Sequence, residues 1–82
     1  MIASVRGILE SIGDDHLVVR VAGVGLQVYV PASVAETVGN VGDEVTLYTT
    51  LIIRDEALTL FGFPNQEGKR LFDQLLAVSG IG

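Results

Sequence analysis

Residues 47–63 read LYTTLIIRDEALTLFGF and contain two runs that are rich in apolar and β-branched side chains. Apolar side chains at alternate positions of the first run, followed by a second run of similar composition, predict two antiparallel strands of a β-hairpin. Arg54, Asp55 and Glu56 occupy the expected tip. Tight hairpin turns favour Asn-Gly or Gly-containing pairs there. The tip therefore carries charge where turn chemistry would prefer glycine, which makes it the first candidate for function.

The rest of the chain contains further strand-like segments separated by turn residues. The expected strands are residues 3–12, 16–22, 26–30, 44–53 and 57–63. Pro31 ends the third strand, and residues 32–38 are expected to form a short helix. Gly7, in the middle of the first strand, is typical of a bent strand in a small barrel. Five strands with a helix between the third and fourth match the element order of an OB-fold barrel, so the predicted fold class is mainly β.

After the hairpin the apolar spacing changes from strand-like to helical. Leu71, Phe72, Leu75, Leu76 and Val78 recur at helical spacing within residues 66–78. Asn65 is a plausible N-cap, and Glu67 would lie in the first turn, where the helix dipole favours an anion. The amphipathic pattern predicts a helix that needs a packing partner.

The chain ends in Ser79, Gly80, Ile81 and Gly82. A Gly-apolar-Gly turn after an amphipathic helix is typical of a helix-hairpin-helix element, whose exposed backbone N–H groups bind a DNA phosphate. The same residues, taken alone, also fit an ordinary helix C-cap. We expect an OB-fold domain at residues 1–63, and residues 64–82 to be either a helix that ends in a C-cap or the first helix of a truncated helix-hairpin-helix domain.

The composition limits the functions that this chain can perform alone. Five basic and ten acidic residues give a net charge of −5, which argues against direct nucleic-acid binding because phosphate neutralisation needs clustered cations. Hydrophobic residues make up 49% of the chain, but no run is long enough to span a membrane, so the apolar surplus predicts self-association. Cysteine is absent, and the N-terminus does not resemble an export signal, so we expect a cytoplasmic protein.

No residue pattern predicts catalysis, a metal or a cofactor. The GVG at residues 23–25 precedes a strand, whereas a phosphate-binding loop precedes a helix, so a hairpin turn is the favoured interpretation. His16 is the single histidine, and its neighbours Asp14 and Asp15 favour a solvated turn over a metal site. No serine, histidine and acid form a plausible triad. We expect a non-enzymatic protein without cofactors.

Aromatic side chains offer an alternative function. Tyr29, Tyr48, Phe61 and Phe63 could stack on bases, as aromatics do on OB-folds that bind single-stranded nucleic acid. Such platforms lie among basic residues, which are scarce here, so packing in the core or a subunit interface is favoured. Direct binding of single-stranded nucleic acid remains the alternative hypothesis, and a purely protein-binding adaptor is a third.

Four stretches, in this order and spacing, resemble the N-terminal part of the RuvA family, the Holliday-junction-binding subunits of the bacterial RuvAB branch-migration complex. They are MIASVRG (1–7), GVGLQVYVP (23–31), IIRDEALTLFGF (52–63) and LFDQLLAVSGIG (71–82). The resemblance spans the whole chain. It implies an OB-fold domain, followed by a domain with two helix-hairpin-helix motifs and a C-terminal domain that engages the RuvB motor. It also implies a non-catalytic homotetramer that holds Holliday junction DNA in recombination and repair, with the RuvC nuclease as a further candidate partner.

The resemblance gives the charged tip a role. Asp55 and Glu56, with Arg54 adjacent, stand where the family carries its acidic pin, which gathers at the centre of the tetramer where the DNA strands cross. The alternative is a solvated edge turn whose charges prevent strand-to-strand aggregation. Leu26 departs from the aromatic residue that often follows GVG, which should affect packing only. Because the chain ends at Gly82, most of the DNA grip and the RuvB contact are expected to be missing, so this chain alone should bind DNA weakly.

Overall fold

The hairpin expected from the sequence is the longest element of the fold. In the computed structural model, which describes residues 1–79, the second half of β4 (Glu44–Arg54), from Tyr48 onwards, pairs with the whole of β5 (Ala57–Phe63). The other elements, in chain order, are β1 (Ser4–Ile12), β2 (His16–Val21), β3 (Val24–Tyr29), the short helix α1 (Ala32–Thr37) between β3 and β4, and α2 (Gln66–Ser79) after β5.

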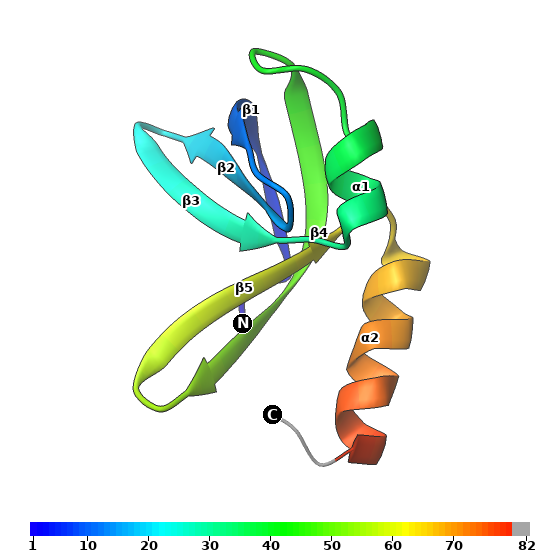
Figure 1. Ribbon diagram of the computed structural model, residues 1–82. Coiled ribbons are helices and arrows are strands. Elements are labelled where there is room, and N and C mark those ends of the chain that lie inside the picture. The colour runs from blue at the N-terminus through cyan, green and yellow to red at the C-terminus, as the bar shows by residue number, and fades with distance from the viewer. Residues whose placement is uncertain (80–82) are drawn as a thin grey trace.

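The five strands close into one barrel in the order β1-β2-β3-β5-β4 (Figure 1). Neighbouring strands are antiparallel except β3 and β5, which pair in parallel through Val28 with Leu60 and Tyr29 with Phe61. The helix α1 lies between the third and fourth strands, and its Ala35 is buried against the barrel. This order confirms the predicted OB-fold barrel followed by a helix.

The core lies inside the barrel and is built mainly from alternate residues of the strands, as a closed sheet requires, with Val30 after β3 and Ala35 of α1 added. Its buried members are Val5, Leu9, Leu17, Val19, Val28, Val30, Ala35, Val45, Leu47 and Leu60. The inward row of β4 continues to Thr49, which is fully buried and donates a hydrogen bond of 2.7 Å from Oγ1 to the carbonyl oxygen of Ile2. Burial of each large apolar side chain stabilises the fold by about 1.5–3 kcal/mol, so the barrel interior supplies most of the stability.

Gly7 allows a close approach between two strands. A Cβ atom at this position would lie 2.3 Å from the carbonyl oxygen of Arg20 on β2, which is far inside van der Waals contact. The register of β1 against β2 then shifts between Leu9 and Ser11. The bend that the sequence predicted for this strand is therefore produced by a close backbone contact at Gly7 and by a bulge shortly after it.

The turn between β2 and β3 differs from the prediction. Val21 pairs with Val24, so the loop consists of Ala22 and Gly23 alone, and Gly25 belongs to β3. Both loop residues have positive φ, 50° and 83°. Two-residue loops of this kind match the twist of the flanking strands, and they require positive φ at both positions. The predicted hairpin turn is therefore confirmed, but its bounds were wrong: the loop is Ala22 and Gly23, and Val24 and Gly25 already belong to β3.

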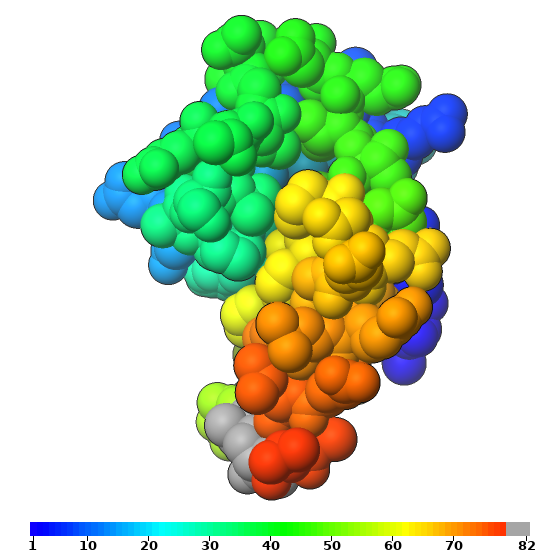
Figure 2. All heavy atoms as spheres, turned by 90° about the vertical axis from the view of Figure 1, so that its right-hand side faces the viewer, coloured from blue at the N-terminus to red at the C-terminus, as the bar shows by residue number. Residues whose placement is uncertain are grey.

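The helix α2 begins at the expected cap and runs back along the hairpin. Asn65 Oδ1 accepts a hydrogen bond of 2.8 Å from the backbone N–H of Gly68, which confirms the predicted N-cap. From β5 the helix passes down one side of the β4–β5 hairpin towards its tip (Figure 1). The side view shows it as a column extending below the barrel (Figure 2). The apolar helix pattern therefore has one partner within the described chain, the outer face of the hairpin.

Candidate nucleic-acid interface

The hairpin tip is a two-residue turn formed by two acids. Arg54 pairs with Ala57, which leaves Asp55 and Glu56 as the whole loop. Their φ angles are 51° and 64°, the left-handed conformation that such a loop needs and that glycine or asparagine adopts most readily. Strain of this kind costs about 1–3 kcal/mol per residue and is found mostly at functional sites. The tip thus keeps two carboxylates at a position where less strained residues would fit.

The end of the hairpin projects from the barrel into solvent. All six residues from 53 to 58 are exposed. Ile53 and Leu58, which face each other across the two strands, are 59% and 69% exposed although they continue the inward-facing row of the barrel. This arm therefore presents an apolar pair directly behind its acidic tip, on a surface open to another macromolecule.

The cations provide little surface for binding phosphate. Among the described residues, Arg54 and Arg70 are the two basic side chains without an ion pair. The other three pair with carboxylates: Arg6 with Glu44 at 4.0 Å, Arg20 with Glu10, and Lys69 with Asp73 at 2.8 Å. Few cations are therefore free to bind phosphate on the described surface, and it is poorly suited to bind DNA without a further basic surface.

The predicted helix-hairpin-helix start lies at the end of the described chain. Ser79 is the last residue of α2, and Gly80, Ile81 and Gly82 lie outside the described residues. A phosphate contact by these residues stays a prediction.

The aromatic residues pack together on the outer face of the barrel, on the side that α2 covers. Tyr29 and Phe61 have ring centroids 5.8 Å apart, and Phe72 of α2 lies 5.2 Å from Phe61 and 5.1 Å from Phe63. Tyr48 is half-buried and pairs with Phe63 across the strands. Because the helix occupies this face, these rings favour the packing interpretation over a base-stacking platform.

His16 belongs to the same edge of the barrel. Its ring meets Tyr29 edge-on with centroids 6.1 Å apart, and its Nδ1 lies 3.0 Å from the Asp15 carboxylate. Within residues 1–79, no three histidine or acidic side chains are grouped so that they could hold a metal ion. No helix in this range is long and apolar enough to cross a membrane.

A groove of 480 Å³ separates the hairpin from the second half of α2. Its lining joins the tip to the helix, with Asp55 and Arg54 at one end and Phe72 and Leu76 on the helix side. The sequence analysis missed this feature, because the groove depends on the direction in which α2 leaves the barrel. The helical spacing of Phe72 and Leu76 was the available signal.

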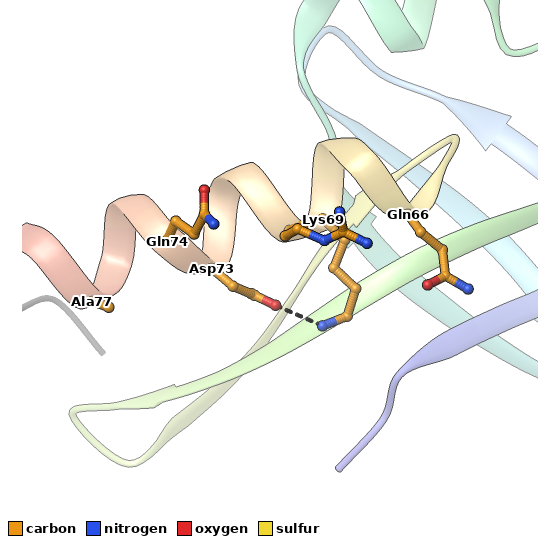
Figure 3. A pocket seen from close by; sticks show the side chains of 6 residues that line it. Gln66, Lys69, Asp73, Gln74 and Ala77 are labelled. Carbon is orange, nitrogen blue, oxygen red and sulfur yellow. Dashed lines mark hydrogen bonds and ion pairs between the residues drawn. The ribbon is translucent and has the colours of Figure 1, made fainter.

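A polar hollow of 430 Å³ lies on the other flank of α2 (Figure 3). Within it, Lys69 Nζ donates a hydrogen bond of 2.8 Å to Asp73 Oδ2, drawn as the dashed line. Thr50 Oγ1 of β4 donates a second bond of 2.6 Å to Asp73 Oδ1. Partial burial raises the pKa of Asp73, but the hydrogen bonds from Lys69 and Thr50 and the charge of Lys69 outweigh it, so this pKa lies below the usual 3.8.

The closed barrel in this strand order, with its helix between β3 and β4, defines an OB-fold protein. The family model described as "RuvA N terminal domain" matches residues 1–62. The chain therefore belongs to the RuvA N-terminal domain family.

Matches to curated proteins over the whole of this chain agree with this assignment. The chain is 55% identical to the protein of Chloroflexus aurantiacus, 51% identical to that of Herpetosiphon aurantiacus and 46% identical to that of Dehalococcoides mccartyi. Each is named "Holliday junction branch migration complex subunit RuvA". Each match covers 100% of this chain but 42% of the relative, so the chain spans about two fifths of the length of these relatives.

Proposed function

We propose that this chain acts as the N-terminal part of a Holliday-junction-binding scaffold subunit, with Asp55 and Glu56 as an acidic pin. The observation that carries the proposal is the exposed hairpin tip, which holds two carboxylates in a strained turn on a projecting arm. The relatives that match across the whole chain carry the corresponding name. A strained turn that retains its acids is better explained by a use for the charge than by turn formation.

The pin would act on DNA by repulsion. A carboxylate about 4 Å from a phosphate is repelled by about 1 kcal/mol in bulk water, and more strongly where water is partly excluded. Four tips gathered at a strand crossover would disfavour continuous duplex there and direct separated strands into their outgoing arms. The grip on DNA must then come from other residues, since the described cations are few and mostly paired with carboxylates.

The assembly and partners are part of the same proposal. We infer a cytoplasmic homotetramer that works with the RuvB motor, with RuvC as a further candidate, and that has no catalytic role of its own. The exposed apolar pair Ile53–Leu58 and the exposed helix residues Leu71, Leu75 and Val78 support contacts to further protein. The proposed division places the OB-fold and pin in residues 1–63 and the start of the DNA-binding domain in residues 64–82.

Site-specific crosslinking tests where the tip lies on DNA. The chain has no cysteine, so Ala57→Cys, next to the pin, can carry a photo-crosslinker in the full-length product after any cysteine beyond residue 82 is replaced. We expect crosslinks to nucleotides at the crossover of a four-way junction. Glu36→Cys, exposed on α1, is the matched control and should give far fewer crosslinks there. Crosslinks from position 57 that fall only in the duplex arms, or none at all, would rule out the proposed placement.

A further inference from the structure

One carboxylate joins α2 to the barrel through both of its oxygens. Asp73 Oδ1 accepts the bond of 2.6 Å from Thr50 of β4, and Asp73 Oδ2 accepts the bond of 2.8 Å from Lys69, one turn earlier in the same helix. The Lys69 side chain is 26% exposed and that of Asp73 is 41% exposed, so the bonds are partly shielded from water. The bond to Thr50 fixes the rotation of the helix, because it is directional and reaches a rigid strand.

The residue next to Asp73 makes the apolar half of the same attachment. Phe72 contacts Phe61 and Phe63, which are two residues apart and therefore share one face of β5. Thr50 lies directly opposite Phe61 in the hairpin register, on that same face. Two consecutive helix residues thus contact the same pair of facing hairpin residues: Phe72 packs its ring on Phe61, and Asp73 accepts a hydrogen bond from Thr50.

The position of this attachment decides where the second half of α2 lies. Beyond Asp73 the helix continues along the hairpin, and Leu76 lines the same groove as Asp55 of the tip. Leu71, Leu75 and Val78 are exposed on the rest of the helix surface. A small rotation of α2 at Phe72 and Asp73 would therefore displace the end of the helix relative to the acidic tip.

We propose that Thr50, Asp73, Phe61, Phe63 and Phe72 form a positioning clamp that fixes the direction of α2. The clamp sets the distance between the acidic tip and the DNA-binding residues that follow α2, and it thereby contributes to the preference for a junction over plain duplex. The inference rests on the proposed function for its DNA consequence, whereas its geometric part is independent of DNA. Thr50, Asp73 and Phe72 are positioning residues and need not touch DNA.

The test measures geometry and DNA preference in the same full-length variants. Spin labels at Val41→Cys, exposed in the loop between α1 and β4, and Ala77→Cys, near the end of α2, report the helix direction by pulsed electron resonance, with unlabelled subunits in excess. We expect a narrow distance distribution with the native clamp. Thr50→Val combined with Phe72→Leu should broaden or shift it, while thermal unfolding shows that the barrel remains folded. Gln74→Ala, on the same helix but outside the clamp, should leave the distribution unchanged.

Titrations with a four-way junction and a duplex of equal length complete the test. The ratio of junction affinity to duplex affinity should fall about fivefold or more in the clamp variant. Fivefold is the lower end of the range for coupling between two sites. An unchanged distance distribution, or a changed distribution with unchanged preference, would overturn the proposal. A failure of the position-57 crosslinks would instead contradict the proposed function and leave the geometric result standing. If Thr50→Val with Phe72→Leu unfolds the protein, Thr50→Val alone removes the hydrogen bond to Asp73 with less loss of packing.

Discussion

At the residue scale, the most informative feature is the backbone of Asp55 and Glu56. Their positive φ angles mark a turn whose conformation asparagine and glycine would adopt with less strain. The sequence showed the charges but gave no sign that both acids would take this conformation, since an acidic pair fits several longer loops equally well. Substitutions at these two residues can test turn strain and charge separately. The stability of the turn depends on the backbone conformation that each residue prefers, whereas repulsion of DNA depends on the charge of its side chain.

Replacement of Asp55 with Asn and Glu56 with Gly should stabilise the hairpin. The pair Asn-Gly is the preferred one for this turn, and relief of strain should raise the free energy of unfolding by about 1 kcal/mol. Thermal unfolding of wild type and variant measures the difference. Asp14→Asn/Glu36→Gln, at two exposed positions away from the hairpin, controls for the loss of two negative charges elsewhere. A variant that melts at or below the wild-type temperature would show that the turn is not strained.

At the element scale, the attachment of α2 shows what a single sequence can and cannot predict. The strands and helices follow from alternation and helical spacing, because their inward residues repeat at a fixed period. The clamp cannot be predicted from these periods, because Thr50 and Asp73 are 23 residues apart and meet only after the helix has folded back on the hairpin. The expected apolar helix face is also divided in the structure: Phe72 and Leu76 turn towards the barrel, whereas Leu71 and Leu75 are exposed.

The clamp carboxylate should make stability depend on acid pH. The pKa of Asp73 is lower in the folded state than its usual 3.8, so ionised Asp73 contributes its full stability above pH 3.8. This contribution should disappear as the pH falls through the folded-state pKa. Its size should stay below about 1 kcal/mol, since the carboxylate is partly exposed to solvent.

Unfolding of wild type and Asp73→Asn, compared from neutral to acid pH, measures the contribution. The difference between the two proteins should be constant near neutrality and should vanish below the folded-state pKa. A difference that persists at the acid end would mean that Asp73 acts through its shape and not through its charge.

At the scale of the whole molecule, the barrel, the projecting arm and the helix have separable roles. The barrel supplies stability through its buried interior, and the arm carries two acids away from it. The helix leaves the barrel and lies along the arm. The OB-fold and the position of the charged tip could be predicted from local patterns and from the family resemblance. The two-residue turn after Val21 and the groove beside the tip could not, because they depend on strand register and on the packing of distant segments.

The central claim, that the tip acts through charge repulsion, is tested most directly by parallel titrations of junction and duplex with full-length Asp55→Asn/Glu56→Gln. These substitutions retain side-chain size and remove two negative charges from each tip, about eight from the proposed tetramer, a local field large enough to affect nearby phosphates. Asp14→Asn/Glu36→Gln removes the same charge from exposed positions away from the tip and is the matched control. We predict that duplex affinity rises by about 1–2 kcal/mol in the tip variant, that junction preference shrinks, and that the gain fades as salt increases. Affinities for both DNAs that equal those of wild type at low salt would contradict the account and leave Asp55 and Glu56 as a solvated turn.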